Sequence, residues 1–444
     1  MRIVIIGGNA AGMSAAAKLK RKNPEAEVII YEMKDYVSFG ACGLPYFIGD
    51  FFGEESRMIV RTKEQAEKMG IQVELRHEVV KVNENGKTVA IRNLTDNSML
   101  TVSYDKLLIA SGASAIIPPI KNVSLENVHT LRTLEDGRSI REKMLSDEVN
   151  NVVVVGAGFI GLELVDAAMH QGKNVTLFQL EDRILKEVFD AEITSVLEKE
   201  LQDKGVSLQV STAVEALFGE EKVTHVVAGG IEYPADLVVI AAGIRPNTRF
   251  LAKTSIACAK NGAVLIDAEG KTNVQDVYSA GDCAVVNHHL KQSSAYIPLA
   301  TTANKLGRIV GDNLAGAKTA FPGTLGASCL KLLDMEAGRV GLLEQEARDH
   351  GYDVKTVFIS DKNHTDYYPG QAPIHVKLVY ENGTKRILGG QIVGVSDAVM
   401  RTNVLSVAIT AGITTEQLGM MDFCYAPPFA RTWDVLNIAG NVAK

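Results

Sequence analysis

The sequence has 444 residues, of which 46% are hydrophobic and 22% charged, and its net charge at pH 7 is −7. This length allows two or three domains. Because the net charge is negative, the protein has no overall positive potential that would attract nucleic acid or an anionic membrane. The longest apolar runs fall well short of the ~20 residues that a membrane-spanning helix needs.

The cysteines exclude two further classes of protein. Cys42, Cys258, Cys283, Cys329 and Cys424 are scattered and odd in number, which fits neither a secreted disulfide framework nor a zinc site. Since the first residues enter a strand directly, we expect no signal peptide. The sequence therefore predicts a cytoplasmic protein with one reactive thiol at most.

The N-terminal stretch predicts a dinucleotide site. An apolar run leads into the glycine-rich turn at residues 7–12, and small residues typical of a closely packed helix follow. The N-terminus of such a helix faces a pyrophosphate. Asn9 replaces the middle glycine of the G-x-G-x-x-G pattern, and Asn tolerates left-handed backbone angles. A second strand, predicted over 27–31, ends in Glu32, which is placed to bind ribose hydroxyls.

The same pattern returns about 150 residues later. A valine-rich strand at 151–155 leads into a complete G-x-G-x-x-G at 156–161, followed by a predicted helix over 162–171. Two such units predict two dinucleotide sites in one chain. Glu163, on the first turn of this helix, either lies at the surface or faces the nicotinamide pocket.

The strand of this second unit ends in Gln179. An acid at this place favours NAD, and a nearby Arg favours NADP. Gln179 provides neither, but Glu181 and Asp182 follow, and no Arg or Lys stands at 179–182. The sequence therefore favours NADH, with NADPH as the alternative.

Three further segments end in small residues that allow a cofactor to approach the backbone. These are the strands predicted within 105–113 and 235–247, and the stretch 272–282, which ends in Gly281 and Asp282. Asp282 is placed to hold a ribityl hydroxyl. The helix that begins within 298–304 has an N-terminus that stabilises negative charge on a reduced flavin.

Cys42 lies in a stretch, residues 37–46, that has the features of a reactive site. Gly40 and Gly43 allow close approach of the backbone, and Pro45 suits the first turn of a short helix. Cys42 at that helix N-terminus would favour the thiolate. The alternative is a buried structural cysteine.

Two other features each have two interpretations. The basic cluster at Lys18 and 20–22 is either a solvated helix end or a binding surface for a phosphate-rich substrate. Residues 321–444 carry no nucleotide motif and predict an α+β interface domain, with a strand at 374–380, a hairpin turn at 381–383 and a helix near 395–411. The aromatic stretches at 367–370 and 425–429 lie in that region, and turns and core packing would be sufficient to explain them.

Taken together, these motifs resemble the FAD-dependent pyridine nucleotide-disulfide oxidoreductases along nearly the whole chain. The resemblance rests on the turn at 7–12 with Glu32, on Ser38-x-x-x-Cys42-Gly43, on 156–161, and on 279–282. It implies an α/β fold with two Rossmann-like, glutathione-reductase-like domains and a C-terminal α+β dimerisation domain. FAD would bind the domain formed by 1–112 and 244–320, NAD(P)H that formed by 113–243, and residues 321–444 would build a homodimer.

Two departures sort the chain within this family, the first toward its single-cysteine branch and the second within that branch, which also contains NADH oxidases and peroxidases. Val37 stands five residues before Cys42, where glutathione-reductase-like members carry a second cysteine. Ala10 stands where NADH oxidases and peroxidases carry a His, so an acid–base partner for peroxide chemistry is missing. The chain looks most like coenzyme A disulfide reductases and NADH-dependent persulfide or polysulfide reductases.

This resemblance implies a reaction and a set of site residues. Electrons pass from NAD(P)H through FAD to Cys42, which reduces coenzyme A disulfide, persulfide or polysulfide without a metal. The alternatives are an NADH oxidase that forms a sulfenate on Cys42, and a flavin-bearing redox sensor read by a protein partner. The catalytic candidates are Cys42, Tyr425 of the partner subunit, Tyr367 and Tyr368, and the coenzyme A candidates are Ser14, Lys18, Arg21 and Ser38. The residues expected at the two dinucleotides are Gly7, Gly8, Ala11, Gly12, Glu32, Val80, Ala110, Ser111, Gly112, Arg132, Gly281, Asp282, Ala300, Gly156, Gly158, Phe159, Ile160, Gly161, Glu163, Gln179 and Gly243.

Overall fold

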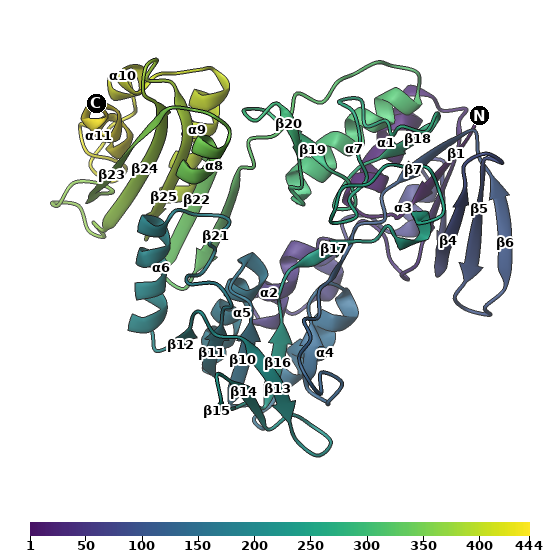
Figure 1. Ribbon diagram of the computed structural model, residues 1–444, viewed down its shortest axis with the longest axis horizontal. Coiled ribbons are helices and arrows are strands. Elements are labelled where there is room, and N and C mark those ends of the chain that lie inside the picture. The colour runs from purple at the N-terminus through teal and green to yellow at the C-terminus, as the bar shows by residue number, and fades with distance from the viewer. The chain divides into compact units, whose positions relative to one another are not determined.

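The computed structural model describes residues 1–444 and contains two compact units (Figure 1). Unit 1 consists of residues 1–44, 53–116 and 244–324. Unit 2 consists of residues 45–52, 117–243 and 325–444. None of the helices is long and apolar enough to cross a membrane.

Unit 1 is built on a parallel sheet with the strand order β18-β7-β1-β2-β3. Alternate residues of β1 enter two different cores, because Ile3 and Ile5 pack on one face and Val4 and Ile6 on the other. The first core contains α1 and α7, and the second contains the antiparallel sheet β4-β5-β6. Both faces of the parallel sheet are therefore covered, which explains its continuous apolar strands. The elements are β1 (Arg2–Ile6), α1 (Ala10–Lys22), β2 (Glu27–Glu32), β3 (Ile71–Leu75), β4 (His77–Asn83), β5 (Thr88–Asn93), β6 (Met99–Ser103), β7 (Lys106–Ile109), β18 (Val277–Ser279) and α7 (Ala300–Leu314).

Unit 2 contains a second parallel sheet, ordered β12-β11-β10-β16-β9, which carries the second glycine turn. A small antiparallel sheet, β13-β14-β15, shares a core with strands β10 and β16. The elements are β9 (Val128–Thr130), α4 (Leu134–Met144), β10 (Asn151–Val155), α5 (Phe159–His170), β11 (Asn174–Phe178), α6 (Ala191–Asp203), β12 (Ser207–Gln209), β13 (Val214–Phe218), β14 (His225–Ala228), β15 (Ile231–Pro234) and β16 (Leu237–Ile240).

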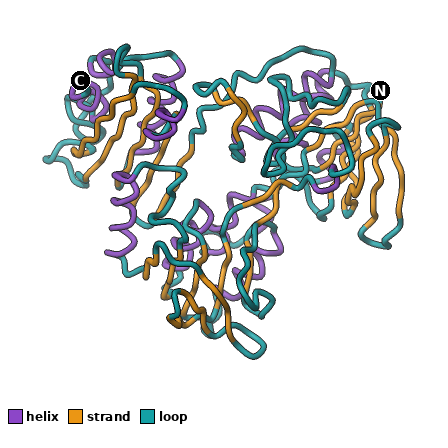
Figure 2. The backbone as a smooth tube through the Cα atoms, in the orientation of Figure 1, coloured by secondary structure: helices purple, strands orange, loops and turns teal.

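The C-terminal part of unit 2 is an antiparallel sheet ordered β21-β22-β25-β24-β23. Every residue of β25 is buried, because α9 packs on one face of the sheet and α6 on the other. The tube view separates these strands from the helices that cover them (Figure 2). The elements are β21 (Ser328–Leu332), β22 (Met335–Gly341), α8 (Glu344–Asp349), β23 (Val354–Lys362), β24 (Pro373–Glu381), β25 (Ile387–Gly394), α9 (Ala398–Thr410), α10 (Thr415–Gly419) and α11 (Val435–Val442).

Short elements complete the chain. The 3₁₀ turns are η1 (Ala41–Gly43), η2 (Glu55–Met58) and η3 (Arg249–Leu251), the short helices are α2 (Leu44–Ile48) and α3 (Lys63–Glu67), and the remaining strands are β8 (Ala113–Ala115), β17 (Ile244–Pro246), β19 (Val286–His288) and β20 (Ser293–Ala295).

The predicted α/β fold class is confirmed, with two Rossmann-like units and a C-terminal α+β region. Differences are confined to element ends. The helix after the second glycine turn begins at Phe159, before the predicted 162. The strand predicted within 105–113 ends at Ile109, because residues 110–112 leave the sheet toward Gly112, whose φ is +68°.

Candidate active site

The two glycine turns have the same construction in the two parallel sheets. Gly7 has a φ of +98° and Gly156 a φ of +108°, which disfavour other residues. A Cβ on Gly7 would lie 2.3 Å from the Ala110 carbonyl oxygen, and one on Gly156 would lie 2.5 Å from that of Ala241. Each turn is therefore pressed against the chain that leaves the neighbouring strand, at the carboxyl ends of the strands where dinucleotides bind.

Glu32 and Gln179 make the same contact in the two units. The amide of Gly8 donates to Glu32 Oε2 over 2.8 Å, and the amide of Ala157 donates to Gln179 Oε1 over 2.8 Å. Burial raises the pKa of Glu32, and the hydrogen bonds from Gly8 and Lys34 oppose that rise. Gln179 thus occupies the place of a ribose-binding acid without its charge.

Asn9 connects the first glycine turn to the cysteine segment. Its Oδ1 accepts a hydrogen bond of 2.6 Å from the Phe39 amide, and the Ser38 amide donates to the Gly8 carbonyl over 2.9 Å. A glycine at position 9 would have no such acceptor. The expectation that Asn9 serves through its tolerance of left-handed backbone angles is wrong, because its φ is −91° and its backbone is extended.

Cys42 lies in η1 and is exposed. The amide of Gly40 donates to the Met58 carbonyl over 2.8 Å, which fixes the entry to this turn, and α2 begins two residues after Cys42. Val37 is only 2% exposed, and a Cβ on Gly8 would meet its Cγ1 at 2.5 Å. Position 37 is therefore filled by a core side chain under the glycine turn.

The remaining candidates of unit 1 gather around the same strand ends. A Cβ on Gly281 would lie 3.0 Å from that of Ala11, which places Gly281 and Asp282 beside the start of α1. Helix α7, which begins at Ala300, packs on α1 so closely that a Cβ on Gly307 would lie 2.5 Å from the Ala11 carbonyl oxygen.

The backbone at Ser111 and Gly112 fits a cofactor. Ser111 donates to the Asn247 carbonyl over 2.7 Å, and no protein atom lies within 4 Å of a Cβ built on Gly112. The set around β1, β2, β7 and β18 thus fits FAD. Val80 lies at a bulge of β4, and Arg132 lies in unit 2, where its amide donates to Asp136 over 2.9 Å.

Unit 2 gathers the candidates for the second dinucleotide. Gly156, Gly161 and Gln179 meet at the ends of β10 and β11, and Gly243 follows β16. Gly158 has open space at its Cβ position, so that the backbone can be approached closely. The turn continues through Phe159 and Ile160 into α5.

Glu163 is the most perturbed carboxyl of unit 2. Burial, and secondly the charge of Asp166, raise its pKa to about 7. Perturbed carboxyls of this kind are concentrated at functional sites.

The coenzyme A candidates on α1 differ in their surroundings. Ser14 donates to Asn304 of α7 over 2.7 Å, and Lys18 forms an ion pair of 3.3 Å with Asp312 of α7. Arg21 is exposed at the end of the helix. Lys18 is thus already engaged in the packing of two helices, whereas Arg21 faces solvent.

Two of the three tyrosine candidates lie together. The hydroxyl oxygens of Tyr367 and Tyr425 are 3.0 Å apart, and Thr365 donates to the Pro427 carbonyl over 3.1 Å, which joins the two loops. The hydrogen bond between the two hydroxyls raises the pKa of Tyr425. Tyr368 packs its ring edge-on against His364 at a centroid distance of 5.6 Å.

Two glycine turns on parallel sheets, together with an exposed cysteine beside one of them, define an oxidoreductase that uses two dinucleotides. The chain belongs to the pyridine nucleotide-disulphide oxidoreductases, whose main region matches residues 1–307 and whose dimerisation domain matches residues 328–435. It is an FAD-dependent NAD(P)H oxidoreductase. The family predicted from the sequence is confirmed.

Individual relatives cover the full chain. The NAD(P)H coenzyme A polysulfide/persulfide reductase of Pyrococcus horikoshii is 39% identical over 443 residues, which is 100% of this chain and 98% of that protein. An NADH oxidase of Enterococcus faecalis is 37% identical over 445 residues, which is 100% of this chain and 99% of that protein. The solved structure of an NAD-dependent persulfide reductase from A. fulgidus has a TM-score of 0.95 at 36% identity and covers 100% of this chain and 83% of that one.

Proposed function

We propose that this enzyme reduces coenzyme A disulfide, or the related persulfide and polysulfide, at Cys42 with electrons from NADH. The observation that carries the proposal is the placement of Cys42. It is exposed, it follows a segment tied to the first glycine turn through Asn9 and Gly8, and its would-be partner position is the buried Val37. A lone cysteine forms a mixed disulfide with the substrate, because it has no neighbour with which to close an internal one.

When bound, NADH and FAD would supply the electron pair that reduces the sulfur on Cys42. Within the proposed division, residues 1–112 and 244–320 hold FAD, and residues 113–243 hold NADH. Glu32 and Gln179 accept backbone hydrogen bonds at the ribose positions of the two sites.

The chain's own residues carry out the thiol chemistry. The Cys42 thiolate attacks one sulfur of the substrate disulfide, the S–S bond breaks, and the leaving thiolate takes the bond pair. Tyr425, hydrogen-bonded to Tyr367, donates a proton to that thiolate. Cys42 then holds the second half of the substrate as a mixed disulfide, which two electrons and one proton would convert to the Cys42 thiolate and the second thiol.

The match to a dimerisation domain supports a homodimer. In that homodimer, Tyr425 is proposed to act from the partner subunit. Ser14, Lys18, Arg21 and Ser38 are the proposed contacts of coenzyme A. The cytoplasmic location stays a prediction.

The likeness to an NADH oxidase favours one second candidate, reduction of dioxygen at the flavin through a Cys42 sulfenate. The decisive experiment follows NADH oxidation under argon with coenzyme A disulfide, coenzyme A persulfide or polysulfide, beside a dioxygen-consumption trace in air. We expect thiol production under argon at a rate above that of dioxygen consumption. Dioxygen consumption without anaerobic turnover on any sulfur substrate would overturn the proposal in favour of the oxidase.

A further inference from the structure

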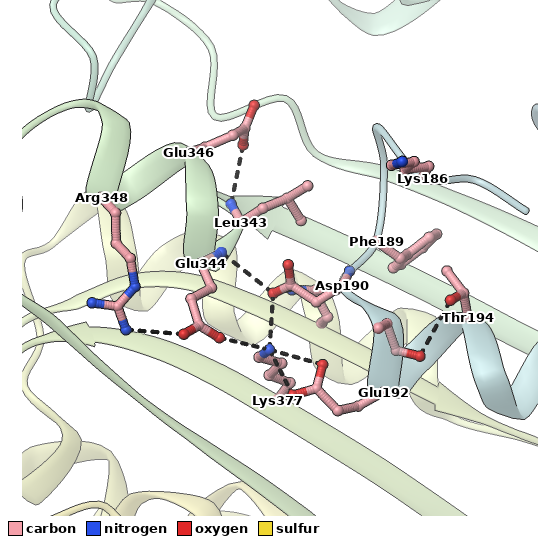
Figure 3. Close-up of polar contacts among 12 residues, drawn as sticks. Lys186, Phe189, Asp190, Glu192, Thr194, Leu343, Glu344, Glu346, Arg348 and Lys377 are labelled. Carbon is pink, nitrogen blue, oxygen red and sulfur yellow. Dashed lines mark hydrogen bonds and ion pairs between the residues drawn. The ribbon is translucent and has the colours of Figure 1, made fainter. Parts of the chain in front are cut away.

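A buried lysine of the C-terminal sheet is bound by three carboxylates. Lys377, on β24, is 2% exposed, and its Nζ lies 2.8 Å from Glu192 Oε1, 3.1 Å from Glu344 Oε2 and 3.3 Å from Asp190 Oδ2 (Figure 3). Burial alone would lower the pKa of Lys377, but the hydrogen bonds and charges of these carboxylates outweigh it and raise the pKa. The ammonium therefore stays charged at physiological pH.

Asp190 is held from the same sheet by a second residue. Its amide donates to Gln391 Oε1 over 2.7 Å, and Gln391 Nε2 donates back to Asp190 Oδ2 over 2.7 Å. The Glu344 amide also donates to Asp190 Oδ2, over 3.3 Å. Gln391 is 1% exposed and Asp190 9%. Lys377 and Gln391 are register partners on β24 and β25. These two neighbouring residues of the sheet therefore bind both the amide and the carboxylate of Asp190.

Asp190 is also the end of a specific loop. Residues 179–190, here called the ribose loop, run from the end of β11 to the start of α6. The end of the second strand of a Rossmann unit meets the ribose of the adenosine half of the dinucleotide. The other end of the ribose loop is fixed at the glycine turn, because Gln179 accepts from the Ala157 amide and the Leu185 amide donates to the Ala157 carbonyl over 3.0 Å.

The ribose loop is compact between these two anchors. Leu185 is 2% exposed and has a φ of +48°, a left-handed conformation that is unfavourable for a non-glycine residue and needs support from its surroundings. The amides of Val188 and Phe189 donate to the Leu185 carbonyl over 2.8 and 3.0 Å. Hydrogen bonds thus run from Ala157 through Leu185 to Phe189, and Phe189 is the residue that precedes Asp190.

We propose that Lys377 and Gln391 are positioning residues that hold the ribose loop through Asp190, so that the C-terminal domain sets the affinity of the enzyme for NADH. The inference rests on the proposed NADH site of residues 113–243. Removal of Lys377 leaves three carboxylates without their shared cation, and the like charges displace Asp190. The displacement reaches the adenosine half of NADH but leaves the nicotinamide end of the site in place.

The test is anaerobic stopped-flow reduction of the flavin in the full-length holoenzyme, which separates the Kd of the nicotinamide donor from the limiting rate. We expect Lys377→Met to raise the Kd for NADH about tenfold (~1.4 kcal/mol) and to leave the limiting rate within about twofold. Lys377→Arg retains the charge and should recover most of the affinity. With reduced nicotinamide mononucleotide, which lacks the adenosine half, Lys377→Met and the wild type should have the same Kd.

Lys204 provides a matched control. Its ion pair with Asp334 also joins α6 to the C-terminal sheet, but at the far end of the helix and with 42% and 64% of the two side chains exposed. Lys204→Met should leave the Kd for NADH within about twofold of wild type. Gln391→Met is the second variant, since it removes both hydrogen bonds to Asp190 while the charges stay paired, and it should raise the Kd about threefold or more.

Two results would overturn the inference: an unchanged Kd for NADH in FAD-loaded Lys377→Met and Gln391→Met, or equal weakening of NADH and reduced nicotinamide mononucleotide. If Lys377→Met does not fold, Gln391→Met decides alone. The sulfur substrate takes no part in this half-reaction, so an error in the proposed substrate leaves the result intact. A wild-type flavin that NADH does not reduce would instead contradict the proposed function.

Discussion

The hydroxyl oxygens of Tyr367 and Tyr425 lie 3.0 Å apart. One phenol therefore donates to the other, and the hydrogen bond raises the pKa of Tyr425. Tyr425 is therefore protonated at neutral pH, which is the state that a proton donor to a leaving thiolate needs. Tyr368 has its ring against His364 instead, so we expect the other two tyrosines to matter more.

Tyr425→Phe should lower kcat with coenzyme A disulfide about 10²-fold, the lower range for loss of a general acid. Tyr367→Phe should have a smaller effect, because it removes only the orienting hydrogen bond. Neither variant should change the rate of flavin reduction by NADH in single-turnover measurements. Tyr368→Phe is the control, and a loss in this variant equal to that in Tyr425→Phe would contradict the assignment.

Cys42→Ser should retain FAD and the dimeric state but lose disulfide reduction. Val37, five residues before Cys42, has no thiol that could replace the one removed. Cys258→Ser removes another exposed cysteine of unit 1 and serves as the control. The measurements are the flavin absorbance, sedimentation, and turnover with coenzyme A disulfide. Near-wild-type turnover of Cys42→Ser would sink the thiol mechanism.

The two glycine turns show which parts of the site could be predicted from the sequence and which could not. Gly7, Gly156 and Glu32 follow from local spacing, because a Rossmann unit is defined by neighbours along the chain. The contact of Asn9 with Phe39 joins residues 30 positions apart, and that of Lys377 with Glu192 joins residues 185 apart. Such long-range polar pairs leave no periodic signal, since either partner alone resembles an ordinary surface residue.

The Gln179 contact predicts the nucleotide preference. Its neutral amide accepts from Ala157 where Glu32 uses a carboxylate in the other unit. We expect a modest preference for NADH over NADPH, and Gln179→Glu should increase it about tenfold (~1.4 kcal/mol) because a carboxylate repels the 2′-phosphate. The ratio of kcat/KM values measures this, with Gln202→Glu on the exposed side of α6 as the control. A wild-type preference for NADPH beyond about tenfold would show that the strand end is misassigned.

Glu163 predicts a pH dependence of stability. Burial, followed by the charge of Asp166, raises its pKa to about 7, so the folded protein binds more protons than the unfolded chain between about pH 4.5 and 7. Stability from this group therefore falls as pH rises through that window. Glu163→Gln should match the wild type near pH 5 and exceed it by about 1–3 kcal/mol at pH 8.

Thermal unfolding of the holoenzyme from pH 5 to 8 checks this expectation. Glu220→Gln, at an exposed position, is the control. A difference between Glu163→Gln and the wild type that does not vary with pH would show that the carboxyl does not titrate in this window.

The end of α1 predicts how the substrate is recognised. Coenzyme A carries a 3′-phosphate and a pyrophosphate, and Lys18 and Arg21 lie three residues apart on one helix. An Arg can bind a phosphate with two hydrogen bonds. Lys18→Ala with Arg21→Ala should raise the KM for coenzyme A disulfide at least about tenfold (~1.4 kcal/mol), and more at low salt because the attraction is screened.

Because Lys18 forms an ion pair with Asp312, we expect Lys18 and Arg21 to contribute unequally to this rise in KM. Arg21→Ala alone should account for most of the rise in KM, because Lys18 is already bound to a carboxylate whereas Arg21 is exposed. Small uncharged disulfides should show no change in either variant, and Lys260→Ala, at an exposed position of unit 1, controls for the loss of surface charge. Equal losses on charged and uncharged disulfides would mean that the cluster stabilises the packing of α1 on α7, and that coenzyme A is recognised elsewhere.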